Sequence, residues 1–118
     1  FLVVHNDIYL KVSSGTNEAF SNAQKIIQKN LCVLYIDNGL PYSRIAIQIT
    51  KKAVKLAVTR NRIRRTIRES FRSLLPKLPS CDILVLITSK ISSEKHEISD
   101  ILIQEWILSI KSLQQSRL

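Results

Sequence analysis

The side chains able to do chemistry in this chain gather in one stretch, and nearly all of them are cationic. Residues 44–77 hold eleven of the eighteen Lys and Arg residues and a single acid, Glu69, so this window has a net charge of +10 against −1 for the rest. Apolar residues recur between the arginines at helical spacing, which places a core behind the charge. A cationic surface on a folded support suits a polyanion, and the window therefore predicts a nucleic-acid-binding site.

Catalytic groups are sparse by comparison. Asp37 and Asp82 fall at the ends of predicted strands, where solvation or capping explains them, and His96 falls on a predicted solvated helix turn. Two cysteines and two histidines assemble no zinc quartet at usable spacing, and neither glycine belongs to a phosphate-binding loop. If the protein serves an enzyme, we expect it to do so by binding, with no cofactor or metal of its own.

Other functions for the arginine run are less favoured. A solvated helix face is the ordinary explanation of a charge run, but here Arg64 and Arg68, then Arg68 and Arg72, repeat like charges at four-residue spacing. A sequence that tolerates this repulsion is expected to bind an anion that offsets it. A membrane surface is a weaker alternative because the apolar face of the same helix is needed for the core. A DNA major-groove contact is disfavoured because no short turn joins a preceding helix.

The elements that must position these residues follow from hydrophobic periodicity and capping signals. The predicted elements, in chain order, are a helix from Thr16 or Asn17 to about Lys29, strands over 31–36 and 44–50, a short strand over 55–58, a helix from Thr59 to before Pro76, a strand over 82–88, and a helix from Ser93 to about Leu113. The order α-β-β-(β)-α-β-α predicts an α/β fold, a two-layer sandwich in which a sheet of about four strands packs against helices.

The basic helix is predicted to have two distinct faces. At 100° per residue its apolar side chains cluster on one side and its arginines line the adjoining side. The apolar set is Ile63, Ile67, Phe71 and Leu74, and the cationic set is Arg64, Arg65, Arg68 and Arg72. The first set is expected to be core and the second to meet the ligand.

Length and composition indicate one domain over residues 1–118, and its charge makes it a nucleic-acid-binding one. The apolar runs are far shorter than the roughly 20 residues that span a bilayer, and residues 1–4 lack the features of a signal peptide. Cys32 and Cys81 open apolar runs, where a free thiol behaves as a small hydrophobe. We therefore expect a cytoplasmic protein with reduced cysteines and no membrane partner.

A long gapped motif gives a more specific indication. Its parts are Lys51-Lys52, Ala57-Val58, Arg60-Asn61-Arg62-Ile63-Arg64-Arg65, Arg68-Glu69 and Phe71-Arg72. At this spacing the pattern resembles the signature of the bacterial ribonuclease P protein subunit. The resemblance extends more weakly over residues 20–90.

The resemblance implies an α/β sandwich with a left-handed crossover around the basic helix. It also implies two RNA partners: the catalytic RNA of ribonuclease P, which holds the Mg²⁺ ions and cleaves, and precursor tRNA, whose 5′ leader the enzyme removes. No protein partner is implied. The RNA-binding residues implied are Lys51, Lys52, Lys55, Arg60, Asn61, Arg62, Arg64, Arg65, Arg68 and Arg72. The residues implied for a leader-binding cleft are Phe20, Tyr35 and Arg44.

The N-terminal part departs from the family pattern. Thr16 stands where the family usually has a second phenylalanine, and residues 1–10 contain no Lys or Arg where a basic segment is usual. Residues 1–15 therefore receive no role from the resemblance. The alternative function is that of a non-enzymatic RNA-binding protein of ribosomal type, which basic patches alone would serve.

Overall fold

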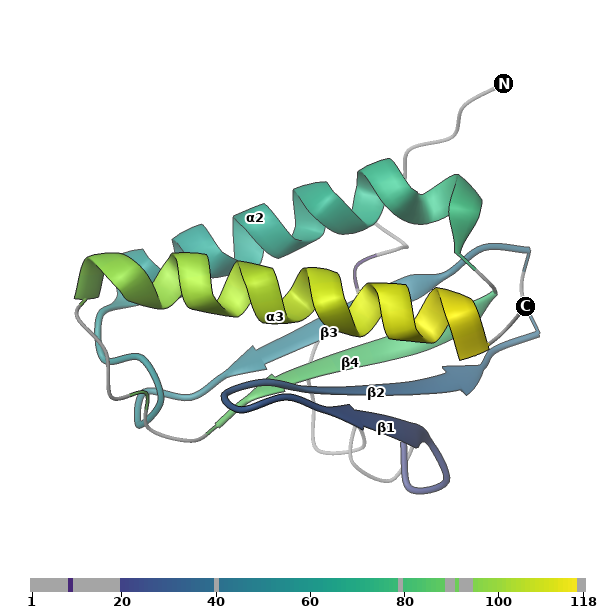
Figure 1. Cartoon of the computed structure of the whole chain (residues 1–118), viewed down its shortest axis with the longest axis horizontal. Helices are drawn as coiled ribbons and strands as arrows, with labels where there is room; N and C mark the ends of the chain where they lie inside the picture. The colour runs from purple at the N-terminus through teal and green to yellow at the C-terminus, as the bar shows by residue number, and fades with distance from the viewer. Residues whose placement is uncertain are drawn as a thin grey trace.

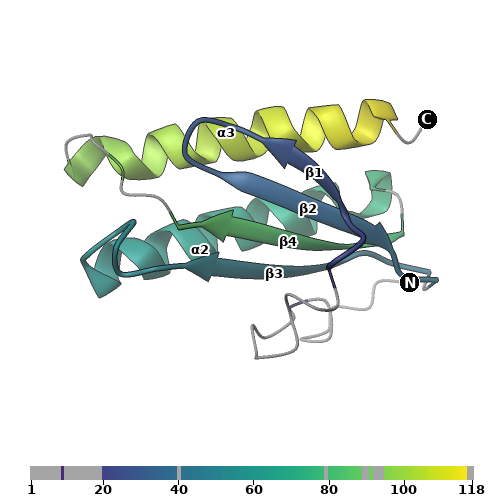
Figure 2. The same cartoon turned by 90° about the horizontal axis from the view of Figure 1, so that it is seen from below.

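Four strands and two long helices make up most of the described chain, which comprises residues 9, 20–39, 41–78, 80–88, 91 and 95–116 of a computed structural model. The strands are β1 (Gln24–Ile27), β2 (Cys32–Asp37), β3 (Arg44–Ile49) and β4 (Cys81–Ile87). The helices are α2 (Ala57–Leu74), followed by the 3-10 turn η2 (Leu75–Lys77), and α3 (Lys95–Ser116). Both helices cover the same face of the sheet (Figures 1 and 2), which confirms the predicted two-layer α/β sandwich.

The strand order is β1-β2-β4-β3, and only the neighbours β3 and β4 run parallel. Parallel neighbours need a crossover connection, and α2 supplies it. Viewed together, Figures 1 and 2 show that this crossover is left-handed, as the resemblance implied, although nearly all such connections are right-handed. A right-handed connection would have carried α2 to the opposite face of the sheet. The left-handed one lets α2 and α3 share a single core.

The main core lies between the sheet and the helices. Alternation along β3 sends Ile45, Ile47 and Ile49 to this side, as predicted, where they meet the apolar face of α2 and the buried side of α3. Trp106 of α3 is fully buried here, and its indole Nε1 donates a hydrogen bond to Ser70 Oγ of α2 at 3.0 Å. This contact joins the two helices directly.

A smaller apolar cluster lies on the other side of the sheet, which we call the open face. Leu34, Ala46 and Leu84 form its centre on the three strands β2, β3 and β4, and Phe20 packs on them with only 6% of its surface exposed. Of the even-numbered residues of β3, Ala46 is thus part of a second, thinner core.

The predicted helix ending near Lys29 is wrong over its described part, residues 20–29. Gln24–Ile27 is strand β1, which pairs antiparallel with β2, and Gln28 N–H donates to the Leu31 carbonyl at 2.8 Å to close the hairpin. The apolar spacing that suggested a helix covers few turns, so sheet pairing overrides it. Residues 16–19 lie outside the described part.

The predicted short strand over residues 55–58 is also wrong. The chain turns after β3, where Ala53 and Val54 donate backbone hydrogen bonds to the Thr50 carbonyl, and α2 begins at Ala57. Leu56 and Val58 are exposed. The fourth strand of the sheet is β1 instead.

The remaining elements match their predictions within a few residues. β2, β3 and β4 occupy the three predicted strand positions, α2 starts two residues before Thr59, and α3 continues past Leu113 to Ser116. Pro76 lies in η2, directly after the helix it was expected to end. The proposed cap Ser93 lies outside the described residues. Within the described chain, neither helix has the length and apolarity needed to cross a bilayer.

Candidate nucleic-acid interface

Helix α2 presents the predicted apolar stripe to the core. Ile63, Ile67 and Phe71 are each 0% exposed, and Leu74 is partly buried against the same cluster. Burial of such side chains stabilises the domain by about 1.5–3 kcal/mol each. The rotation of the helix about its axis is therefore fixed, and with it the direction of the arginines.

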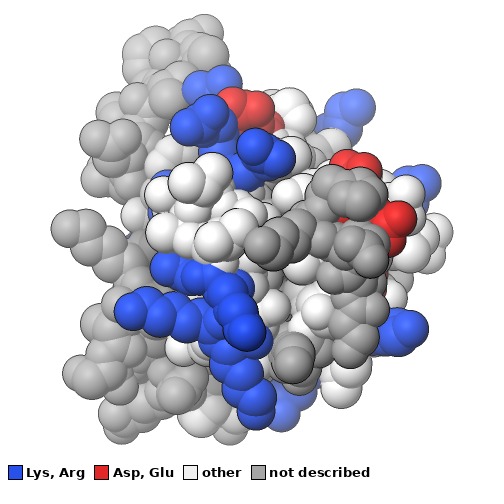
Figure 3. Space-filling view, turned by 90° about the vertical axis from the view of Figure 1, so that its left-hand side faces the viewer, with Lys and Arg blue, Asp and Glu red and all other residues white. Residues whose placement is uncertain are grey.

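The arginine side of α2 forms a groove of about 470 Å³. We call this the arginine groove, and it is lined by Tyr9, Asn61, Arg64, Arg65, Arg68, Glu69 and Arg72. Seen from the end of the molecule at which α2 begins, the surface carries two groups of Lys and Arg side chains separated by uncharged residues, with an acid beside the upper group (Figure 3). The predicted cationic face therefore exists as one hollowed surface.

Arg64 lies among other arginines in this groove, and its pKa is lowered there. Burial, and then the nearby charges of Arg60 and Arg68, lower the pKa of its guanidinium. Its Nη1 donates a hydrogen bond to Asn61 Oδ1 at 3.2 Å, which fixes the amide beside it. An anion in the groove would relieve the repulsion that these groups exert on one another.

Arg68 has a partner that the sequence did not suggest. Its guanidinium carbon lies 5.3 Å from the ring centroid of Tyr9, within the range of a cation–π contact. Tyr9 is held by a bridge to Ile45 of β3 and packs against the main core. A lone tyrosine in an N-terminal stretch without recognisable motif gave no signal of this contact.

Arg60 serves the helix more than the groove. Leu56, the residue before α2, offers no side-chain cap, and the Arg60 Nη1 donates to the carbonyls of Val54 and Lys55 at 2.9 and 2.8 Å. Arg60 thereby ties the first turn of α2 to the preceding loop. Arg62 is exposed and does not line the groove.

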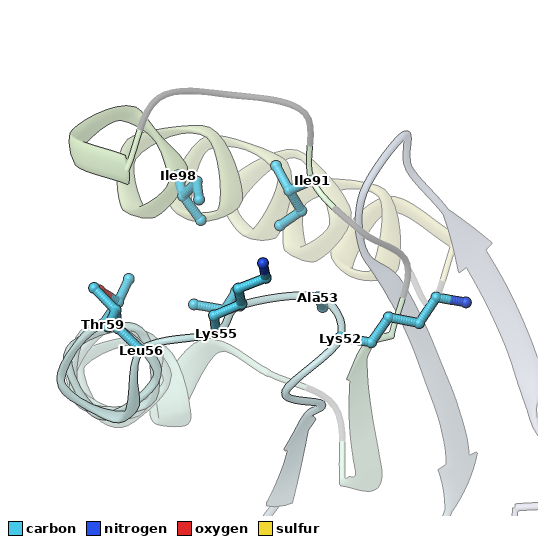
Figure 4. Close-up of a pocket in the computed structure, with 8 residues that line it drawn as sticks. Lys52, Ala53, Lys55, Leu56, Thr59, Ile91 and Ile98 are labelled. Carbon is cyan, nitrogen blue, oxygen red and sulfur yellow. The ribbon is translucent and has the colours of Figure 1, made fainter.

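The loop lysines surround a different hollow. Lys52 and Lys55 line an apolar pocket of about 130 Å³ between the loop before α2 and the start of α3, and Ile91 and Ile98 form its other side (Figure 4). Lys51 is exposed in the same turn. The three lysines extend the positive surface toward the start of α2 but lie outside the arginine groove.

The open face holds Arg44 in a fixed position. Its Nε and Nη2 donate to the two carboxylate oxygens of Asp82 at 2.8 and 2.7 Å, and Asn38 Nδ2 donates to the same carboxylate at 2.9 Å. The hydrogen bonds from Arg44 to Asp82, against the opposing effect of burial, raise the pKa of the Arg44 guanidinium. Asp82 is therefore an ion-pair partner, a role that the solvation or capping expected from the sequence did not include.

Phe20 and Tyr35 do not share a cleft. Phe20 packs on the open face, whereas Tyr35 belongs to the main core on the helix side and is 4% exposed. The Tyr35 hydroxyl donates to Gln24 Oε1 at 2.7 Å. Because adjacent residues of a strand point to opposite faces, Leu34 takes the open-face position beside it.

The described residues include no group of three or more His, Cys, Asp or Glu placed to hold a metal ion. Cys32 and Cys81 are free thiols. Burial raises the pKa of the Cys32 thiol, with Lys25 acting in the opposite direction.

Comparison with known proteins gives a consistent result. The family model of ribonuclease P matches residues 5–106. The ribonuclease P protein component of Nitrosococcus oceani is 36% identical over 102 residues, 84% of each chain, and that of Pseudoalteromonas atlantica is 36% identical over 99 residues, 83% of this chain and 82% of the other.

Solved structures show the same fold. The RNase P protein of Staphylococcus aureus superposes with a TM-score of 0.67 at 20% identity, covering 93% of this chain and 94% of the other. The RNase P protein of Thermotoga maritima gives a TM-score of 0.66 at 24% identity, covering 86% and 91%.

Proposed function

The chain belongs to the family of ribonuclease P protein components, and from that premise we propose that the arginine groove of α2 is the surface that binds the catalytic RNA. Family membership makes the protein a subunit of ribonuclease P with a part in tRNA processing. It also decides between the two RNA-binding functions considered above, against the ribosomal type. The finer assignments of partner, surface and catalytic role are our proposal.

One observation carries the assignment of the surface. Four arginines of α2 line a single groove in which Glu69 is the only acid among the described lining residues. Clustered guanidiniums bind phosphates with charge-assisted hydrogen bonds and release condensed counterions from RNA. The loop lysines Lys51, Lys52 and Lys55 continue the positive surface, and Arg60 would act by holding the start of α2.

We propose that the RNA carries the catalytic centre. The cationic groups of the arginine groove and of the loop before α2 are guanidiniums and ammoniums, which would stabilise phosphate but do not activate water. Mg²⁺ ions held by the RNA would supply that chemistry, and the protein would screen repulsion between two RNAs.

The open face is our proposed surface for the 5′ leader of precursor tRNA. Cations stand on both edge strands, Arg44 on β3 and Lys25 on β1, with apolar residues between them. These cations would hold phosphates of a single strand along the rim of this face, while the apolar centre is buried and supports the rim from below. Phe20 belongs to the floor of this surface, and Tyr35 supports β2 from behind.

Free thiols agree with a cytoplasmic location.

Precursor tRNA cleavage tests the division of labour. The purified full chain, freed of RNA, is expected to leave precursor tRNA intact, and to raise single-turnover cleavage by the catalytic RNA at low Mg²⁺. Robust cleavage by the protein alone would overturn the proposed roles. A protein that binds the RNA but leaves cleavage unchanged at every Mg²⁺ concentration would overturn the accessory function.

A further inference from the structure

Glu69 is the unexpected member of the arginine groove. It lines the groove together with four arginines, yet the ion pair found among the described residues is the one between Arg44 and Asp82. The carboxylate is exposed and, among the residues that the structure describes, accepts no hydrogen bond from the guanidiniums around it. A groove for phosphate alone would gain nothing from this acid, because it repels the ligand.

The groove also has a part suited to stacking. Tyr9 and Arg68 meet at 5.3 Å, and both line the groove. Unpaired bases in RNA complexes stack on aromatic rings or on guanidinium planes. The backbone of Tyr9 is bridged to Ile45 of β3 and its side chain packs against the main core, which places the ring at the groove.

We propose that the arginine groove is a subsite for one unpaired nucleotide of the RNA, with a base that carries an exocyclic amino group. The base lies against the Tyr9–Arg68 pair, the flanking arginines hold its phosphates, and Glu69 accepts a hydrogen bond from the amino group. The inference rests on the proposed function and adds base selectivity to it. The groove volume of about 470 Å³ lies within the roughly 300–1,000 Å³ typical of small-ligand sites.

The chemistry of Glu69 sets the selectivity. A carboxylate accepts from the amino group of cytosine, adenine or guanine, but faces a carbonyl oxygen at the matching position of uracil. Asn61 also lines the groove, about two turns of α2 before Glu69. Its Oδ1 accepts from Arg64, which leaves its amide hydrogens for a phosphate oxygen. Uridine is therefore the nucleotide that the groove disfavours.

The test compares short uridine oligonucleotides with and without one central cytidine, bound to the full chain at low salt. The cytidine strand is expected to bind about fivefold more tightly, which corresponds to one moderate base contact. Glu69→Gln should raise the affinity for both strands and bring their ratio close to one, because an amide can also donate to the uracil oxygen. The matched control Asp100→Asn removes an exposed acid from α3 and should leave the ratio unchanged.

A second pair of variants tests the stacking partner. Tyr9→Phe keeps the ring and should keep both affinity and ratio, whereas Tyr9→Ala should weaken both strands and reduce their difference. Equal binding of the two strands by the parent chain would overturn the subsite. So would a cytidine preference that survives in Glu69→Gln.

Different outcomes would contradict the proposed RNA-binding surface itself. If Arg65→Ala weakens binding of the catalytic RNA while the parent shows no base preference, the RNA-binding surface stands and the nucleotide subsite is wrong. If Arg65→Ala and Arg72→Ala both leave binding of the catalytic RNA unchanged, the surface itself is wrong.

Discussion

Arginine has two electrostatic settings in this molecule. On β3, Arg44 is paired with Asp82 by two charge-assisted hydrogen bonds and is locked in place. On α2, Arg64, Arg65 and Arg72 line the groove without an ion pair among the described residues. A paired arginine contributes order to the surface around it, whereas an unpaired cluster holds charge available for a ligand. The comparison indicates that the ion pair fixes the shape of the open face, whereas the unpaired arginines of the groove attract anions.

Removing the support under the arginine groove should have the largest effect. Phe71→Ala leaves a cavity behind the cationic face, and because the side chain is 0% exposed it should cost about 3–5 kcal/mol of unfolding free energy. Denaturant melts followed by circular dichroism measure the loss. Phe71→Leu, which keeps most of the volume, should cost clearly less. Parental melting of Phe71→Ala would mean that the two faces of α2 are assigned wrongly.

The next largest effect is expected in the salt dependence of binding, which should differ between the arginine groove and the open face. If the groove and the loop lysines neutralise about six phosphates, affinity for the catalytic RNA should fall about 10³-fold between 50 and 200 mM salt. Binding of a single-stranded leader to the open face should respond less steeply, since Arg44 is already paired. Filter binding across that range provides both slopes. Equal slopes would contradict the difference drawn between the two surfaces.

Breaking the pair on the open face should have a moderate effect on stability. Asp82→Asn leaves Arg44 without its carboxylate, and because the pair is only partly buried we expect a loss of about 1–2 kcal/mol, between exposed and buried pairs. Thermal and denaturant melts of Asp82→Asn, Arg44→Gln and the double variant form a double-mutant cycle. Additive losses in that cycle would show that the two side chains do not stabilise each other.

A single unpaired arginine should matter least to the fold. Arg65→Ala should change the unfolding free energy by less than about 0.5 kcal/mol, while it weakens RNA binding by about 1 kcal/mol and lowers the salt slope by about one contact. Lys111→Ala on α3, an exposed cation away from the groove, is the matched control. An equal loss of RNA binding in both variants would indicate a general charge effect instead of a site.

The basic helix was predictable because its information is local. The positions of Ile63, Ile67 and Phe71 repeat at helical spacing and fix the buried face, and the arginines then follow on the adjoining side. The strands β2, β3 and β4 are long apolar or alternating runs and were found for the same reason. These elements position the groove.

The wrong or missed predictions concern features that depend on contacts between residues far apart in the sequence. β1 is a strand because β2 pairs with it, and four residues with a helix-compatible pattern do not reveal that partner. The run from Leu31 to Ile36 is apolar on both faces of the sheet, so alternation could not show which side Tyr35 takes. Tyr9 contacts Arg68 across 59 positions of sequence, through a bridge to β3 that no motif announces.

Trp106 is the chain's sole tryptophan, so the tryptophan fluorescence of the protein comes from this one side chain. The indole is buried between α3 and α2 and is hydrogen-bonded to Ser70, the residue next to Glu69. Its fluorescence therefore senses the docking of α2 on α3 from inside the core, out of reach of a bound polyanion. Intrinsic emission can follow the integrity of the helix pair during an RNA titration, so loss of binding and loss of structure can be recorded separately in one cuvette, without an added dye.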